Sequence, residues 1–277
     1  MTEVKTSMHS EKITKEYQKQ QEMDVESILQ NKSVMPVFQP VVSLQNGSIL
    51  GYEALSRVTL PCSVTSPEDL FQTAARIGKL WDLEQLCRKL ALQKIFRDHH
   101  KDFQSMLFLN VSPLVIHDPK FQAGFTREYL QRYQIDPSQI VFEVTERDSC
   151  HNLDNLFLMV EHYKEQQYEI AIDDLGSCYS GLTLICKLKP HYIKLDMALI
   201  RDIHTNSEQY ALVQGLMTFS RLSHMQLIAE GIETKEELET LIQIGIQYGQ
   251  GYFLGRPSPS LSPLNPAAFD IINKNSA

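Results

Sequence analysis

The sequence lacks the patterns that mark several common protein classes. Its five cysteines are scattered, odd in number and form no C-x-x-C pair, which is typical of free thiols in a reducing cytoplasm and not of a disulfide framework or a zinc site. No signal peptide is present, and no apolar run approaches the roughly 18 residues that a membrane span requires. We therefore expect a cytoplasmic location and no membrane segment in this chain.

An excess of basic charge is also missing. The 26 Lys and Arg residues are outnumbered by 34 Asp and Glu residues, which gives a net charge of −8. This balance argues against a nucleic-acid polymer as partner, although a small anionic substrate remains compatible where cations offset the negative field. There is no G-x-S-x-G elbow for a nucleophilic serine. No Gly-rich phosphate loop follows an early strand, as it usually does in an open doubly wound sheet.

Apolar strands that alternate with amphipathic helices fill most of the chain. A strand over residues 37–42, the turn signal Asn46-Gly47 and a return strand over residues 49–55 predict an opening antiparallel hairpin. Later strands are expected near residues 106–111, 140–144, 170–172, 192–196, 226–230 and 246–253, and the intervening helices include 81–99, 121–133, 153–166 and 209–223. About eight such strands, near-continuously apolar, predict an α/β fold, a TIM-like (β/α)8 barrel with an antiparallel first strand. An open doubly wound sheet is the alternative.

The two ends of the chain differ from this repeat. Residues 1–33 are polar, contain no Gly or Pro and carry only a thin apolar stripe of Val25, Ile28 and Leu29. We expect an N-terminal polar helical extension outside the core, either a docking helix or a solvated tail. The repeat is assigned to residues 34–265, and residues 266–277 are expected to form a C-terminal tail.

Two adjacent aspartates, Asp173 and Asp174, end a short apolar run and precede glycine and small polar residues. Consecutive strand side chains face opposite ways, so both carboxylates can reach one site only where the strand breaks into a loop. Unpaired, they would repel each other, and a hard divalent cation removes that conflict. A turn or a helix cap built on the pair is the alternative interpretation.

Polar residues recur wherever an apolar strand ends. The set comprises Glu53, Asn110, Glu143, Asp173, Asp174, Lys194, Asp196, Glu230, Glu233 and Gln250. In a barrel these strand ends converge on one face, where active sites form. Oxygen ligands without His or Cys favour Mg²⁺ or Mn²⁺ over zinc, and hydrolysis of a phosphodiester by two metals suits such a cluster. Lys194 could hold a phosphate oxygen or a water, or neutralise buried carboxylates.

Eight sequence blocks, in the correct order, resemble those of EAL domains, which are phosphodiesterases of the bacterial messenger cyclic di-GMP. The blocks are Phe38-Gln39-Pro40-Val41, Glu53-Ala54-Leu55-Ser56-Arg57, Asn110-Val111-Ser112-Pro113, Glu143-Val144-Thr145-Glu146, Asp173-Asp174-Leu175-Gly176, Lys194-Leu195-Asp196, Ala229-Glu230-Gly231-Ile232-Glu233-Thr234 and Gln250-Gly251-Tyr252. The resemblance covers about residues 34–260. It implies a homodimer, two Mg²⁺ or Mn²⁺ ions per site and hydrolysis of cyclic di-GMP to linear pGpG.

The resemblance also implies roles for single residues. Glu53, Asn110, Glu143 and Asp173 would ligate the first metal, Asp173 would bridge to the second metal, and Asp174 would help to bind that second ion. Glu230 would be the general base, and Lys194 would hold the nucleophilic water or complete the metal site. Gln39, Leu55 and Arg57 would lie along the dinucleotide. The supporting residues would be Glu146, which steadies the loop after the aspartate pair, together with Asp196, Glu233 and Gln250.

The loop after the aspartates departs from the usual family pattern. Leu175 replaces a phenylalanine, Ser177 a threonine, Cys178 a glycine and Gly181 a serine. In the family this loop couples the second metal to dimer contacts, so the changes bear on rate and regulation. Because every acidic position of the two-metal site is kept, an active hydrolase is favoured. A weakly active or inactive domain that senses cyclic di-GMP, or contacts a protein partner, is the alternative.

Overall fold

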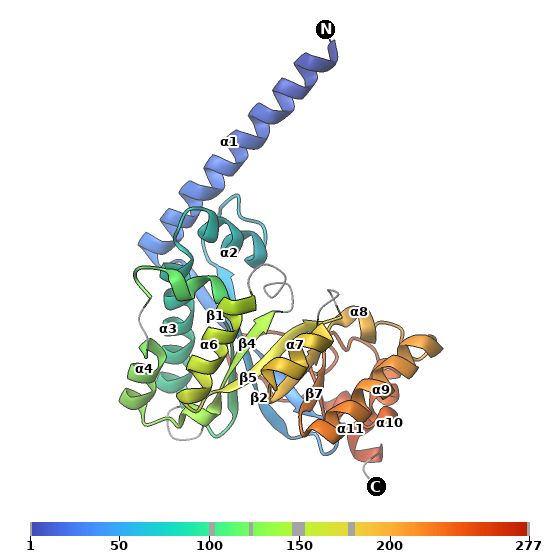
Figure 1. Cartoon of the computed structure of the whole chain (residues 1–277). Coiled ribbons are helices and arrows are strands. Elements are labelled where there is room, and N and C mark those ends of the chain that lie inside the picture. Colours follow the sequence, from blue (N-terminus) through green and yellow to red (C-terminus); the bar gives the residue numbers. More distant parts are fainter. Residues whose placement is uncertain (1, 100–102, 122–123, 146–152, 177–180, 276–277) are drawn as a thin grey trace.

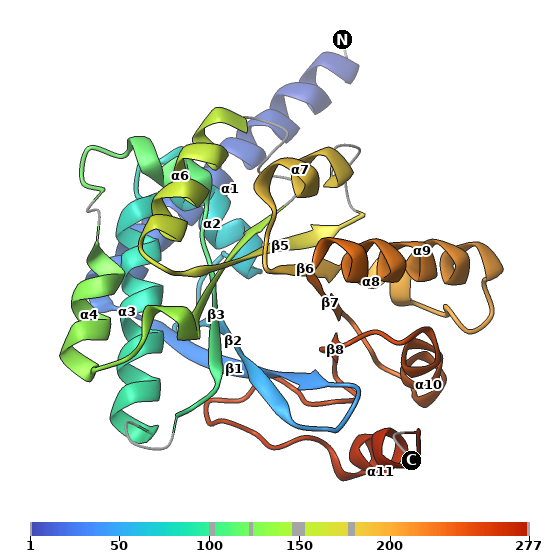
Figure 2. The ribbon, with the colours of Figure 1, turned by 60° about the horizontal axis from the view of Figure 1, so that its bottom comes forward.

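Eight strands close into one barrel within the residues that the computed structural model describes, which are 2–99, 103–121, 124–145, 153–176 and 181–275 (Figures 1 and 2). The strands are β1 (Val34–Ser43), β2 (Ile49–Val58), β3 (Met106–Asn110), β4 (Ile140–Thr145), β5 (Glu169–Leu175), β6 (Tyr192–Leu195), β7 (Gln226–Ala229) and β8 (Tyr248–Gly249). They are hydrogen-bonded in sequence order. The predicted TIM-like α/β barrel is therefore confirmed, and the open sheet is excluded.

The first strand runs against both of its neighbours. β1 pairs antiparallel with β2 and with β8, whereas the pairs from β2 to β8 are parallel. The turn between β1 and β2 contains Gly47 at φ 73°, and Asn46 Oδ1 accepts a hydrogen bond from the Ser48 N–H at 2.9 Å. The hairpin predicted from Asn46-Gly47 is thus confirmed, because both residues favour this tight turn.

Helices cover the outside of the barrel (Figure 2). They are α2 (Pro67–Arg76), α3 (Leu80–His99), α4 (Phe125–Tyr133), α6 (Leu153–Glu165), α7 (Gly181–Leu188), α8 (Met197–Ile200), α9 (Ser207–Ser223), α10 (Lys235–Ile244) and α11 (Pro266–Asn275), with 3-10 turns η1 (Pro113–His117) and η2 (Pro137–Gln139). The helix expected from residue 121 begins only at Phe125, because Gly124 adopts a left-handed conformation at φ 83°. None of the described helices is both long and apolar enough to cross a membrane.

The barrel interior consists of an apolar layer beneath a polar one. Val41, Phe108, Val141, Ala171, Tyr192 and Ile228, from β1 and from β3 to β7, form a separate buried cluster. Side chains two positions apart on a strand share a face, so the residues two positions further along β3 to β7 also point inward. Those residues are Asn110, Glu143, Asp173 and Lys194, together with Glu230, which directly follows the last residue of β7. The strand period therefore places the polar residues together in one layer.

Both chain ends contain helices that pack on the body. The last turns of α1 (Thr2–Asn31) bury Val25 and Ile28 in a small cluster with residues of α2 and α3, while its beginning projects away from the barrel (Figure 1). The apolar stripe expected in residues 1–33 is therefore a docking surface. The stretch expected to be a C-terminal tail contains α11, whose Ala268 and Ile272 are buried because the helix packs against α10.

Candidate metal centre

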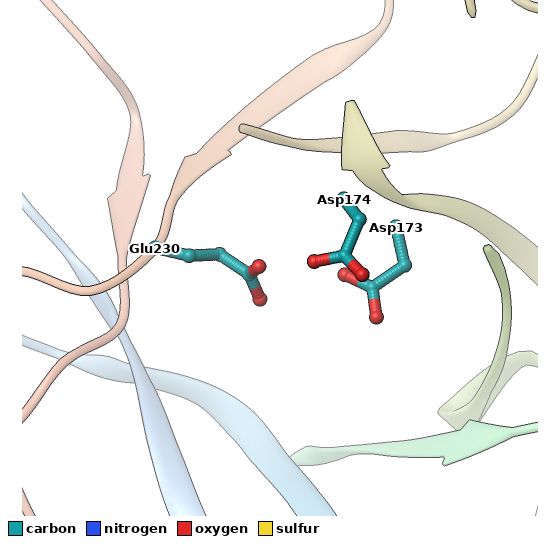
Figure 3. A group of neighbouring side chains, drawn as sticks. All are labelled: Asp173, Asp174 and Glu230. Atoms are coloured by element: carbon teal, nitrogen blue, oxygen red, sulfur yellow. The ribbon is translucent and has the colours of Figure 1, made fainter. Parts of the chain in front are cut away.

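A bulge in β5 brings the two adjacent aspartates to the same side. The pairing of β5 with β6 shifts register between Ile172 and Leu175, and Asp174 has the left-handed φ of 56°. This irregularity breaks the strand alternation, and aspartate tolerates a left-handed backbone better than most residues. Asp173 and Asp174 consequently point with Glu230 into one space (Figure 3). Oxygen atoms of the three carboxylates lie within 4.8 Å of one another.

Lys194 lies at the centre of the polar layer. Its Nζ is 2.7 Å from Glu143 Oε1, 2.7 Å from Glu230 Oε1, 3.0 Å from Asp173 Oδ1 and 3.6 Å from Glu53 Oε2. The lysine side chain is 1% exposed, so these ion pairs act with little screening by solvent. One buried ammonium thus faces four carboxylates from four other strands or strand ends.

Amide side chains fix the orientation of Glu53. Asn110 donates a hydrogen bond from Nδ2 to Glu53 Oε1 at 2.9 Å, and Gln250 donates from Nε2 to Glu53 Oε2 at 2.7 Å. The Gln250 amide also reaches Gln39 Oε1 at 3.1 Å, and Gln39 Nε2 donates to the Gly255 carbonyl. Because its amide nitrogen serves Glu53, Asn110 retains its carbonyl oxygen as a possible cation ligand.

Carboxylates outnumber the single lysine in this layer, and this excess shifts their pKa values. Burial raises the pKa of Glu143 and of Glu230, and neighbouring carboxylates raise both further, so both lie well above the usual range although Lys194 opposes the shift. For Glu53 burial acts in the same direction, but Lys194 and the two amide donors outweigh it and lower the pKa. Burial disfavours the Lys194 charge, yet the surrounding carboxylates raise its pKa well above the usual value.

The donor set fits a hard divalent cation. Within the described part of the chain, Glu143 Oε2 is buried and finds no hydrogen-bond donor. Such an oxygen is costly to bury unless a proton or a cation approaches it. Glu53, Glu143, Asp173, Asp174 and Glu230 supply carboxylates, and the chemistry of these oxygens matches Mg²⁺ or Mn²⁺.

The structure places the expected nucleotide-binding residues on two neighbouring strands. Leu55 and Arg57 follow Glu53 at two-residue intervals on β2 and so share its face. Both are half-buried, and Arg57 donates from Nη1 to the Ser56 carbonyl at 2.9 Å. Gln39 lies on β1 directly opposite Glu53 in the ladder. A row of side chains therefore leads away from the carboxylate layer along the β1–β2 pair.

Two of the expected supporting residues, Asp196 and Glu233, lie apart from this polar layer. Asp196 caps α8 by accepting a hydrogen bond from the Ala198 N–H at 2.6 Å. Glu233 forms an ion pair with Arg201 at 2.9 Å, where both side chains are more than a third exposed. Glu146 lies outside the described residues, as do Ser177 and Cys178 of the loop after the aspartates.

Sequence analysis did not single out Glu237, which is a buried organiser of the loop after Glu230. Glu237 Oε2 accepts hydrogen bonds from the backbone N–H groups of Glu233 and Thr234, at 2.8 and 3.0 Å, and Oε1 accepts one from Asp202 at 3.2 Å. The signal was available in part, because Thr234 and Glu237 have capping-box spacing. The contact with Asp202 is not local and leaves no trace in the sequence.

Comparison with known proteins agrees with this geometry. The EAL domain family model matches residues 20–257. Over 246 residues, which are 86% of this chain and 35% of the relative, the sequence is 29% identical to the bifunctional diguanylate cyclase/cyclic di-GMP phosphodiesterase MucR of Pseudomonas aeruginosa. This chain spans between 27% and 45% of the length of the curated relatives, several of which are named cyclic di-GMP phosphodiesterases.

Solved structures of EAL proteins are also similar to this chain. A standalone EAL protein from Vibrio cholerae, solved in a cyclic di-GMP-bound form, is 30% identical with a TM-score of 0.73, covering 85% of this chain and 97% of the other. BlrP1 of Klebsiella pneumoniae, solved as a complex with manganese and cyclic di-GMP, is 26% identical with a TM-score of 0.73, covering 82% and 56%. From the family match over most of its length, we conclude that this chain belongs to the EAL domain family.

Proposed function

We propose that the chain is a phosphodiesterase that hydrolyses cyclic di-GMP to linear pGpG with two Mg²⁺ or Mn²⁺ ions. The observation that carries the proposal is the polar layer itself. Every carboxylate expected of a two-metal site is present, and Asp173, Asp174 and Glu230 converge. Relatives named as cyclic di-GMP phosphodiesterases, and EAL structures that contain this nucleotide, support the choice of substrate.

When bound, the ions would lower the pKa of the attacking water and stabilise charge on the phosphoryl group. Glu53, Asn110, Glu143 and Asp173 would hold the first ion, and Asp173 with Asp174 would hold the second. Asp173 would therefore belong to both sets.

Glu230 takes the proton of the attacking water onto its carboxylate. The raised pKa of this buried group makes it an effective proton acceptor once it has ionised. The ammonium of Lys194, 2.7 Å from Glu230, would hold the water by its positive charge, since its three N–H groups face Glu143, Glu230 and Asp173. Arg57 binds a phosphate oxygen of the dinucleotide with its planar guanidinium, while Gln39 and Leu55 position the rest of the substrate. Gln250 holds Glu53 in place.

A binding module without useful turnover is the second candidate. The altered loop supports it, since Leu175 is buried in the core where the family usually has a phenylalanine. Gly176, at φ 109°, would place a Cβ 2.8 Å from Leu199 Cδ1, so the backbone at this residue is closely packed against α8.

The deciding experiment incubates the purified chain with cyclic di-GMP and Mg²⁺ or Mn²⁺ and follows the appearance of pGpG. We expect turnover that Glu53→Ala or Asp173→Ala abolishes. The control Glu239→Ala, which changes a side chain 37% exposed on α10, should leave turnover unchanged. Nucleotide that is retained without linear product would refute the hydrolase and favour the binding module. Unchanged rates in either acidic variant would remove the metal assignment.

We further propose that the chain acts in the cytoplasm as a homodimer, which rests on its resemblance to the family. Sedimentation velocity across a range of protein concentrations tests this state. A monomer throughout that range would contradict it.

A further inference from the structure

The segment after β3 is held by three consecutive contacts. Asn110 donates to Glu53, the Val111 N–H donates to the Glu143 carbonyl at 3.0 Å, and the Ser112 N–H donates to Glu84 Oε1 at 2.8 Å. Pro113 has no N–H, and η1 begins at that residue. The bond to Glu84 is therefore the last backbone anchor of the segment before the chain turns away.

Glu84 is itself held from behind by a buried arginine. Arg88, one turn along α3, donates from Nη2 to Glu84 Oε2 at 3.1 Å, and both side chains are less than 5% exposed. A second guanidinium nitrogen donates to Thr126 Oγ1 at 3.1 Å, and the group lies 5.1 Å from the ring centroid of Phe142. Arg88 thereby ties α3 to α4 and to the residue that precedes Glu143 on β4.

Stability alone does not account for this ion pair. Desolvation of two charges cancels most of their attraction, and well-packed apolar residues of similar volume are often as stable. The arrangement instead uses both oxygens of Glu84 for orientation. Oε2 faces Arg88, and Oε1 faces the backbone of the segment that carries Asn110.

From these contacts we infer that Glu84, fixed by Arg88, is a positioning residue that sets the Asn110 side chain for cation binding. The inference rests on the proposed function in that Asn110 is one of its metal ligands. Glu84 acts at a distance of two residues along an extended backbone, without touching the ion. Groups that orient a metal ligand from outside the ligand set commonly change metal affinity by 10- to 100-fold when they are removed.

Two double variants isolate the hydrogen bond from the ion pair. Glu84→Gln with Arg88→Met removes both charges but keeps an oxygen that accepts the Ser112 N–H. Glu84→Leu with Arg88→Met removes the charges and the acceptor together. Circular dichroism and thermal unfolding establish that both fold. Glu84→Asp provides a further check, since it keeps the charge beside Arg88 but shortens the reach toward Ser112.

The readouts are Mn²⁺ binding by titration calorimetry and hydrogen exchange of the Ser112 amide in metal-free protein. We expect the leucine variant and Glu84→Asp to bind Mn²⁺ about 10- to 100-fold more weakly and to exchange the Ser112 amide faster. The glutamine variant keeps both properties near those of the wild type.

Equal losses in the glutamine and leucine variants would refute the inference, because packing and not the hydrogen bond would then matter. Unchanged Mn²⁺ affinity in the leucine variant, with faster Ser112 exchange, would also refute it. Failure of the proposed function has a different signature, namely wild-type protein that binds Mn²⁺ without hydrolysing cyclic di-GMP. A wild-type chain that binds no Mn²⁺ would refute both.

Discussion

Replacement of Lys194 by methionine tests whether the polar layer is built to receive cations. The substitution keeps an unbranched side chain of similar length and removes the charge that lies within 3.6 Å of Glu53, Glu143, Asp173 and Glu230. Metal-free Lys194→Met protein therefore contains four buried or half-buried carboxylates that have lost their shared partner. Divalent ions, where they bind, would replace this charge and reverse the effect.

The expected magnitude follows from burial. Removing one partner of a buried ion pair costs about 3–5 kcal/mol. In a domain of this size 1 kcal/mol shifts the Tm by about 2–4 °C, so the metal-free variant should unfold about 6–20 °C below the wild type. Lys235→Met is the matched control, because its ion pair with Glu239, at 3.5 Å, is on the surface. Exposed ion pairs between residues four positions apart on a helix contribute only about 0.3–0.5 kcal/mol to stability.

The assay is thermal unfolding near pH 8, with chelator and then with excess Mn²⁺. This pH is chosen because buried carboxylates that have lost Lys194 can relieve their repulsion by binding protons, and they do so less at high pH. A ligand at 100 times its Kd stabilises a protein by about 2.7 kcal/mol. We expect Mn²⁺ to raise the Tm of Lys194→Met by more than it raises the Tm of the wild type. The reasoning is refuted if metal-free Lys194→Met behaves like Lys235→Met. It is refuted equally if Mn²⁺ raises the Tm of the variant no more than that of the wild type.

Three further predictions concern the surroundings of the layer. Burial raises the pKa of Glu237, but backbone N–H donors and Arg201 outweigh it and lower the pKa. The ionised carboxylate therefore stabilises the folded state above about pH 4.5, and this stabilisation is lost as pH falls. Urea unfolding of Glu237→Gln should therefore give a deficit of about 1–2 kcal/mol at pH 7 that shrinks below pH 4.5; a deficit independent of pH would contradict this. Gly251→Ala would place a Cβ against the Ile232 carbonyl oxygen, and calorimetry should give a loss of about 1–3 kcal/mol in the free energy of unfolding; a variant as stable as the wild type would contradict this. Asp174→Asn should keep its left-handed backbone and its Tm but bind Mn²⁺ more weakly; unchanged affinity in calorimetry would exclude Asp174 as a ligand.

The order of strands and the membership of the polar layer were accessible to sequence reasoning for a simple reason. On β3 to β7 an inward apolar residue is followed two positions later by a polar one, as in Phe108 and Asn110 or Ala171 and Asp173. This period is a local property of strands and can be read without a structure. The Thr234–Glu237 capping box is a local pattern of the same kind, because it depends only on residues three positions apart.

Non-local contacts were beyond the same reasoning. The sequence required a break at the aspartates, but the form of that break, a register shift with Asp174 at positive φ, depends on how β5 pairs with β6. Likewise the thin stripe of α1 became a docking surface because α2 and α3 offer it apolar partners, which periodicity within α1 does not reveal. Glu233 faces Arg201, 32 residues away, and spacing in the sequence does not predict that partnership.

Closure of the barrel between its first and last strands determines when the site can form during synthesis. β1 meets β8 through the pairs Val42–Gly249 and Ser43–Tyr248, and the Gln250 side chain donates a hydrogen bond to the Gln39 side chain across the same junction, 211 residues away in the chain. Gln250 in turn holds Glu53. A chain still emerging from the ribosome has β1 to β7 before it has this last partner. Glu53 therefore acquires its final orientation only when synthesis has passed Gln250, so an incomplete chain has carboxylates without an assembled centre.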